Sequence, residues 1–61
     1  MKRLKLLKHL RENCCVLLRE GGNHSIYINT ITSTKTSVPR HADIDEITVL
    51  KICIQLEIPK L

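Results

Sequence analysis

The stretch GGNHSIYIN, residues 21–29, decides the fold of this 61-residue chain. Its paired glycines, Gly21 and Gly22, are the clearest turn signal in the sequence, and the β-branched and aromatic residues of 25–29 are typical of a strand. The run 15–20 before the glycines also has strand character. The stretch therefore predicts two antiparallel strands joined by a short glycine turn.

The segments that follow this hairpin predict another turn and a third strand. Residues 30–34 are rich in Ser and Thr and are expected to form the turn, and Lys35–Val38 is expected to form the strand. Pro39 closes the strand, because proline cannot donate a hydrogen bond to a ladder. The three strands together predict an antiparallel meander.

Leucines recur at helical spacing before the hairpin and predict an amphipathic helix from residue 2 to about 13. The apolar stripe comprises Leu4, Leu6, Leu7 and Leu10. Lysines occupy outward positions, Lys5 and Lys8 among them. Asn13 is expected to end the helix, because asparagine tolerates the left-handed backbone conformation.

The segment Asp43–Glu46 resembles a capping box and predicts a second helix from about 44 to 57, ended by Pro59. The chain is therefore expected to be a single α+β domain over residues 1–61, ordered helix, three strands, helix. In so small a domain, the economical packing puts both helices on one face of the sheet. The other face is expected to stay polar and hydrated.

The composition restricts the core and the class of protein. The chain has no Trp or Phe and a single Tyr, so its core must be aliphatic and thin. Cys14, Cys15 and Cys53 lack metal-ligand spacing, and reduced thiols of a cytoplasmic protein fit them best. No segment has the continuous apolar run of a signal peptide or the length of a membrane span, so no membrane association is expected. We expect neither a metal nor a cofactor.

Charge is distributed unevenly along the chain. Residues 1–42 hold eight Lys/Arg against two Glu, a net charge of +6, whereas residues 43–61 hold two Lys against four acidic residues, a net charge of −2. A basic region of this kind favours an anionic partner, and a phosphate backbone is the commonest such partner of a small basic domain. A solvated basic face without any ligand fits the charge about equally well.

His24 stands out among the three histidines, because it begins the second predicted strand directly after the glycine turn. Strand alternation places it with Ile26 and Ile28, on what is expected to be the inward face, at its rim. Glycines there allow a substrate to approach the main chain. From the residues alone, His24 is either a catalytic imidazole or a histidine that closes the edge of the core. His9 is expected to be solvated.

Two segments of the sequence resemble the signature of a known family. Residues 22–27, Gly-Asn-His-Ser-Ile-Tyr, and residues 38–41, Val-Pro-Arg-His, are similar to the segments Gly-Ser-His-His-Ile-Tyr and Val-Pro-Arg-His of the HicA, or YcfA-like, toxins. The resemblance covers almost the whole chain, including both helices. The sequence departs from the family pattern at Asn23 and Ser25, and it has Cys14 where the family often has glycine.

The resemblance implies a fold like that of a double-stranded-RNA-binding domain, and a ribosome-independent mRNA endonuclease held inactive by a HicB-type antitoxin. It also implies that His24 is the catalytic residue, and an imidazole can take the proton of the RNA 2′-hydroxyl without a metal. The turn formed by Gly21, Gly22 and Asn23 is expected to admit the substrate. The candidate RNA contacts are cationic or imidazole side chains, namely Arg19, Lys35, Arg40, His41, Lys5 and Lys8.

The second predicted helix carries more apolar residues than one buried stripe needs. Leu50 and Ile54 are expected to lie on an exposed strip that meets the antitoxin or a second copy of the chain, unless the helix is simply buried. Such a strip is compatible both with a homodimer and with a toxin–antitoxin hetero-oligomer. Two other function classes compete: a non-catalytic double-stranded-RNA-binding module of the same fold, and a purely structural interaction domain.

Overall fold

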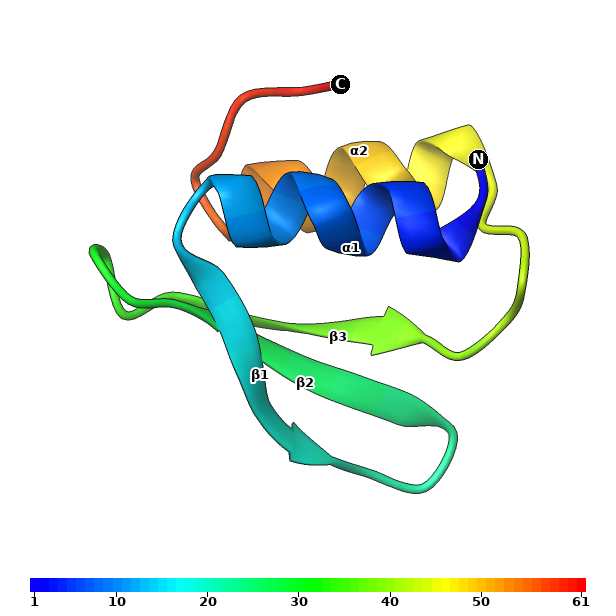
Figure 1. Cartoon of the computed structure of the whole chain (residues 1–61), viewed down its shortest axis with the longest axis horizontal. Coiled ribbons are helices and arrows are strands. Elements are labelled where there is room, and N and C mark those ends of the chain that lie inside the picture. The colour runs from blue at the N-terminus through cyan, green and yellow to red at the C-terminus, as the bar shows by residue number, and fades with distance from the viewer.

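The glycine turn joins two antiparallel strands, and a third strand and two helices complete the fold (Figure 1). The structure is a computed structural model that describes residues 1–61. Its elements are α1 (Arg3–Glu12), β1 (Cys15–Glu20), β2 (His24–Asn29), β3 (Lys35–Pro39) and α2 (Glu46–Gln55). The predicted order of one helix, three strands and a second helix is confirmed.

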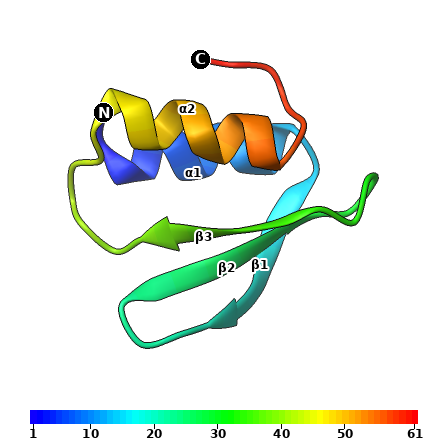
Figure 2. The same ribbon diagram turned by 180° about the vertical axis from the view of Figure 1, so that it is seen from behind.

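The three strands form one open antiparallel sheet in the order β1-β2-β3. Both helices lie side by side on the same face of this sheet, as Figures 1 and 2 show from opposite directions. The predicted α+β architecture is therefore confirmed. The helices cover only one face of the sheet, and the other face is open.

The two faces of β2 are reversed from the sequence prediction. Ser25, Tyr27 and Asn29 are buried against the helices, whereas His24 is exposed on the opposite face. The inward placement predicted for His24 is wrong. Tyr27 is the only Tyr of a chain without Phe or Trp, and the burial of its ring fixes the alternation of the whole strand.

The two polar residues beside Tyr27 can be buried because each has hydrogen-bond partners. The Ser25 hydroxyl donates to Glu20 Oε1 over 2.7 Å, and Asn29 Nδ2 donates to the Leu56 carbonyl over 2.7 Å. Buried polar groups are costly only when they lack such partners. Hydrophobicity alone therefore did not decide which face of β2 enters the core.

The open face of the sheet is less polar than the sequence predicts. Ile26 and Ile28 project from it and are only partly buried, and Val16, which pairs with Ile28, is 47% exposed. The prediction of a polar, hydrated face is wrong at these positions. The alternation that buries Tyr27 turns these aliphatic side chains outward.

Helix α1 packs its leucine stripe into the core, and a left-handed residue follows its C-cap. The buried leucines are Leu6, Leu7 and Leu10. Leu4 is 78% exposed, so its predicted place in the stripe is wrong. The left-handed residue is Cys14, with a φ of 64°, whereas Asn13, predicted for that role, has a φ of −112°. Asn13 instead donates from its side-chain amide to the His9 carbonyl over 2.9 Å.

Helix α2 is shorter at both ends than the predicted span 44–57. Its N-cap is Asp45, whose carboxylate accepts hydrogen bonds from the hydroxyl and the amide of Thr48, and these bonds lower the pKa of Asp45. The predicted capping box at Asp43 is wrong. Asp43 Oδ2 lies 3.6 Å from Lys2 Nζ, and this ion pair, with a backbone bridge between the same residues, joins the segment before α2 to the start of α1.

The apolar residues of α2 divide into a buried and an exposed stripe. The buried stripe comprises Val49, Ile52 and Cys53 and is continued by Leu56 directly after the helix, and the exposed stripe comprises Ile47, Leu50 and Ile54. The core is aliphatic apart from Tyr27 and the buried thiols of Cys15 and Cys53, whose pKa values are raised by burial. Neither helix combines the length and the apolarity needed to cross a membrane.

Candidate active site

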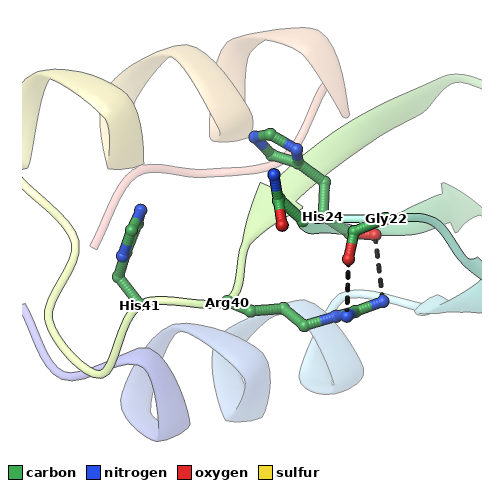
Figure 3. Close-up of a pocket in the computed structure, with 5 residues that line it drawn as sticks. Gly22, His24, Arg40 and His41 are labelled. Carbon is green, nitrogen blue, oxygen red and sulfur yellow. Dashed lines mark hydrogen bonds between the residues drawn. The ribbon is translucent and has the colours of Figure 1, made fainter.

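An open pocket of about 420 Å³ lies at the end of the sheet where β2 begins. It is lined by Gly22, Asn23, His24, Arg40 and His41 (Figure 3). Antiparallel pairing builds this pocket, because His24 pairs with Pro39 and brings the glycine turn beside the segment that follows β3. Two segments that are separate in the sequence therefore meet in space.

His24 is the first residue of β2, and its side chain is exposed. Because Ser25 points into the core, the His24 imidazole lies on the other side of the strand, away from the helices. A histidine that closed the edge of the core would be buried, so that interpretation does not describe this structure. The imidazole is accessible to a ligand in the pocket.

The two glycines of the turn have different surroundings. A Cβ at Gly21 would come within 3.1 Å of the His24 carbonyl oxygen, so the tight approach there favours glycine. A Cβ at Gly22 would meet no atom within 4 Å. The packing of the chain does not require a glycine at position 22, and the absence of a side chain leaves its backbone open to a ligand.

Arg40 acts as a clamp on the glycine turn. Its Nη1 donates to the Gly22 carbonyl over 2.9 Å, and its Nη2 donates to the Gly21 carbonyl. Its Nε donates to Glu20 Oε1 over 3.0 Å, within an ion pair. All three guanidinium nitrogens of this predicted RNA contact are thus engaged within the chain, and Figure 3 shows the side chain running toward the Gly22 backbone.

A second layer of polar contacts supports the clamp from α1. Arg3 Nη2 donates to the Ser25 hydroxyl over 3.0 Å, and Arg3 Nε donates to the Pro39 carbonyl over 2.9 Å. The hydrogen bond from Ser25 to Glu20, together with the neighbouring Arg40, lowers the pKa of Glu20. The Glu20 carboxylate therefore stays ionised at neutral pH and keeps its ion pair with the clamp.

Sequence reasoning missed Arg3, Glu20 and Ser25 as parts of this site. Their contacts join three elements, and no local pattern marks them. The one available signal is the pairing of β2 with both of its neighbours, Glu20 with Ser25 and His24 with Pro39, which brings the opposite charges of Glu20 and Arg40 to the same end of the sheet.

His41 lies across the pocket from His24, on the wall made by the segment after β3 (Figure 3). Its side chain is exposed. The next residue is held in place, because the Ala42 carbonyl accepts a hydrogen bond from the Arg3 amide over 2.9 Å. The pocket therefore presents two imidazoles from two different segments. No three His, Cys, Asp or Glu side chains are grouped so that they could hold a metal ion.

The other predicted RNA contacts lie outside the pocket. Arg19 and Lys35 pair with outward-facing residues of β2, so both project from the open face of the sheet, on which His24 also lies. Lys5 and Lys8 are exposed on α1, in the helix layer. Exposed basic side chains are thus present on both layers of the fold.

A family model described as "HicA toxin of bacterial toxin-antitoxin" matches residues 4–58. The match includes all five residues that line the pocket and nearly the whole of the five secondary-structure elements. No curated protein and no solved structure matches the chain.

Replacing Arg40 by alanine is expected to loosen the glycine turn, because it removes the donors to the Gly21 and Gly22 carbonyls. The Gly21 amide, which donates to the His24 carbonyl over 2.8 Å, should exchange its hydrogen faster. The free energy of unfolding should fall by about 1 kcal/mol. Hydrogen exchange by NMR and urea denaturation measure the two effects. Arg19→Ala is the control, and an unchanged Gly21 exchange rate in Arg40→Ala would contradict the clamp.

Proposed function

The chain belongs to the HicA toxin family of bacterial toxin–antitoxin systems, and we propose that it is an endoribonuclease that cleaves mRNA independently of the ribosome. His24 is the catalytic residue of the proposed reaction. The observation that carries the proposal is the exposed His24 imidazole in an open pocket whose other wall is formed by Arg40 and His41. Family membership and the chemistry of this pocket support the same activity.

RNA supplies its own nucleophile, the 2′-hydroxyl next to the scissile phosphate. A neutral imidazole can take the proton of this hydroxyl, and acid–base catalysis of this kind typically accelerates a reaction by about 10²- to 10⁴-fold. This proton transfer needs no metal ion. DNA lacks the 2′-hydroxyl and is therefore not a substrate of the proposed reaction.

The shape and the charge of the surface suit a polymer that lies across it. The pocket is open and has no hydrophobic residue in its lining, and Gly22 leaves the backbone accessible there. Arg19 and Lys35 on the open face, with Lys5 and Lys8 on α1, are the proposed contacts to phosphates further along the RNA.

A non-catalytic double-stranded-RNA-binding module is the alternative for this fold. Such a module reads the shape and the backbone of a duplex, and the exposed Lys5 and Lys8 on α1 favour it. Both functions predict that RNA binding weakens with salt. They differ in their dependence on His24, which only the nuclease requires.

We expect His24→Ala to abolish RNA cleavage by the purified protein and growth arrest on expression, since it removes the proposed base. The fold should be kept, because this side chain is exposed. Gel analysis of RNA fragments and circular dichroism measure cleavage and folding. His9→Gln is the control, because His9 lies near the C-terminal end of α1, with its Nε2 2.6 Å from the Pro59 carbonyl. Full activity of His24→Ala would reject the assignment, and DNA should survive the same assay.

The partner implied by the family is an antitoxin, and we propose one of the HicB type. It must block the pocket or the basic surface around it, and the net charge of +6 on residues 1–42 predicts an acidic face on it. Its association with the toxin should therefore weaken with salt. The exposed stripe of α2, which contains Leu50 and Ile54, is the proposed apolar contact for this antitoxin.

The double variant Leu50→Lys/Ile54→Lys should weaken binding of the antitoxin by at least about tenfold, because it places two charges in an apolar contact. Calorimetric titration of the purified pair measures the affinity. Ile31→Lys is the matched control, since Ile31 is 75% exposed but lies in the turn between β2 and β3. If the double variant binds like the wild type, the stripe is not part of the interface.

A further inference from the structure

We propose that His41 is a second catalytic residue, which protonates the leaving 5′-oxygen while His24 takes the proton of the 2′-hydroxyl. This inference rests on the endoribonuclease activity proposed above. It adds the acid that the reaction needs, and it gives His41 a chemical role distinct from binding a phosphate.

The pocket holds two imidazoles that are free to act on a substrate. His24 comes from the start of β2, His41 comes from the segment after β3, and both side chains are exposed. Figure 3 shows them on different walls of the pocket, with space between the rings. The hydrogen bonds at this end of the sheet run through Arg3, Glu20 and Arg40, and neither imidazole takes part in them.

The other polar side chains at the pocket are unsuited to donate this proton. Guanidinium groups do not act as proton donors to a leaving group, and the nitrogens of Arg40 bind the glycine turn. The Asn23 amide has no acidic proton. The hydrogen bond from Ser25 and the neighbouring Arg40 hold the pKa of Glu20 below its usual range, so Glu20 is an ionised acceptor. His41 is the remaining imidazole that lines the pocket, and imidazoles are the side chains that most often act as general acids in catalysis.

The backbone around His41 is fixed, although its imidazole is free. Arg40, the residue before His41, is anchored by its own hydrogen bonds to the glycine turn. The Ala42 carbonyl, directly after it, accepts the hydrogen bond from the Arg3 amide over 2.9 Å, and Asp43 lies 3.6 Å from Lys2 Nζ. A side chain that acts in catalysis gains from such a fixed support, because its position relative to the substrate is set in advance.

The proposed step is a transesterification. The 2′-oxygen attacks phosphorus as its proton passes to the His24 imidazole, and the bond between phosphorus and the 5′-oxygen breaks as protonated His41 gives its proton to that oxygen. The products are a 2′,3′-cyclic phosphate and a 5′-hydroxyl end. His24 is then protonated and His41 neutral, and proton exchange with water restores both.

The experiment compares single-turnover cleavage of two RNA oligonucleotides that contain the same mapped cleavage site. One is normal RNA, and the other has sulfur in place of the bridging 5′-oxygen, so that its leaving thiolate needs no protonation. We expect His41→Ala to cleave normal RNA about 10²- to 10⁴-fold more slowly than the wild type, and the sulfur-containing RNA at close to the wild-type rate. His24→Ala should cleave neither substrate, and His9→Gln should match the wild type on both.

Equal slowing of His41→Ala on both substrates would overturn the proposal, because it would assign His41 to phosphate binding or to support of the fold. Wild-type cleavage of normal RNA by His41→Ala, or rescue of His24→Ala by the sulfur substrate, would overturn it as well. His41→Gln repeats the test with a smaller change in size, and circular dichroism monitors folding. If the wild type cleaves neither RNA, both the endoribonuclease proposal and the role of His41 are rejected. If His24→Ala is the only inactive variant, the endoribonuclease proposal stands and the role of His41 is rejected.

Discussion

Burial of the Tyr27 ring against the two helices is the constraint on which the rest of the structure depends. A strand alternates its faces, so Ser25 and Asn29 enter the core with Tyr27, and His24 is turned to the open face. Both helices cover the same side of the sheet, and neither reaches the side on which His24 lies. The exposure of the candidate catalytic imidazole is therefore a consequence of how the small core is packed.

The same packing places a hydroxyl in the core, and the contacts that satisfy it also build the pocket. Ser25 receives a hydrogen bond from Arg3 and donates one to Glu20, and Glu20 in turn pairs with Arg40, which holds the glycine turn. Core and pocket thus share one hydrogen-bonded network. Ser25 stands where the resemblance leads us to expect a second histidine, and in this chain the position has a structural role.

Local signals predicted the elements of this fold better than the surroundings of their side chains. The turn signals placed each strand within one residue of its observed bounds, and the helical spacing and capping pattern placed both helices within two, because such signals act between neighbours. The prediction of which face of β2 is buried was wrong, because Ile26 and Ile28 are typical core residues. The hydrogen bonds that allow Ser25 and Asn29 to be buried instead cannot be seen in the sequence. The clamp by Arg40 joins distant segments, so only the pairing of β2 with β3 could reveal it. The meeting of His24 with residues 38–41 follows from the antiparallel pairing of β2 with β3, in which His24 pairs with Pro39.

Attack by the RNA 2′-hydroxyl and attack by water leave different groups at the new RNA ends, so the ends show which nucleophile this pocket uses. Mass spectrometry of the fragments from a reaction with the purified protein identifies the groups at the new RNA ends. We expect a 2′,3′-cyclic phosphate on the upstream fragment and a 5′-hydroxyl on the downstream fragment. A 3′-hydroxyl together with a 5′-phosphate would show that another nucleophile attacked phosphorus, and it would contradict the role proposed for His24.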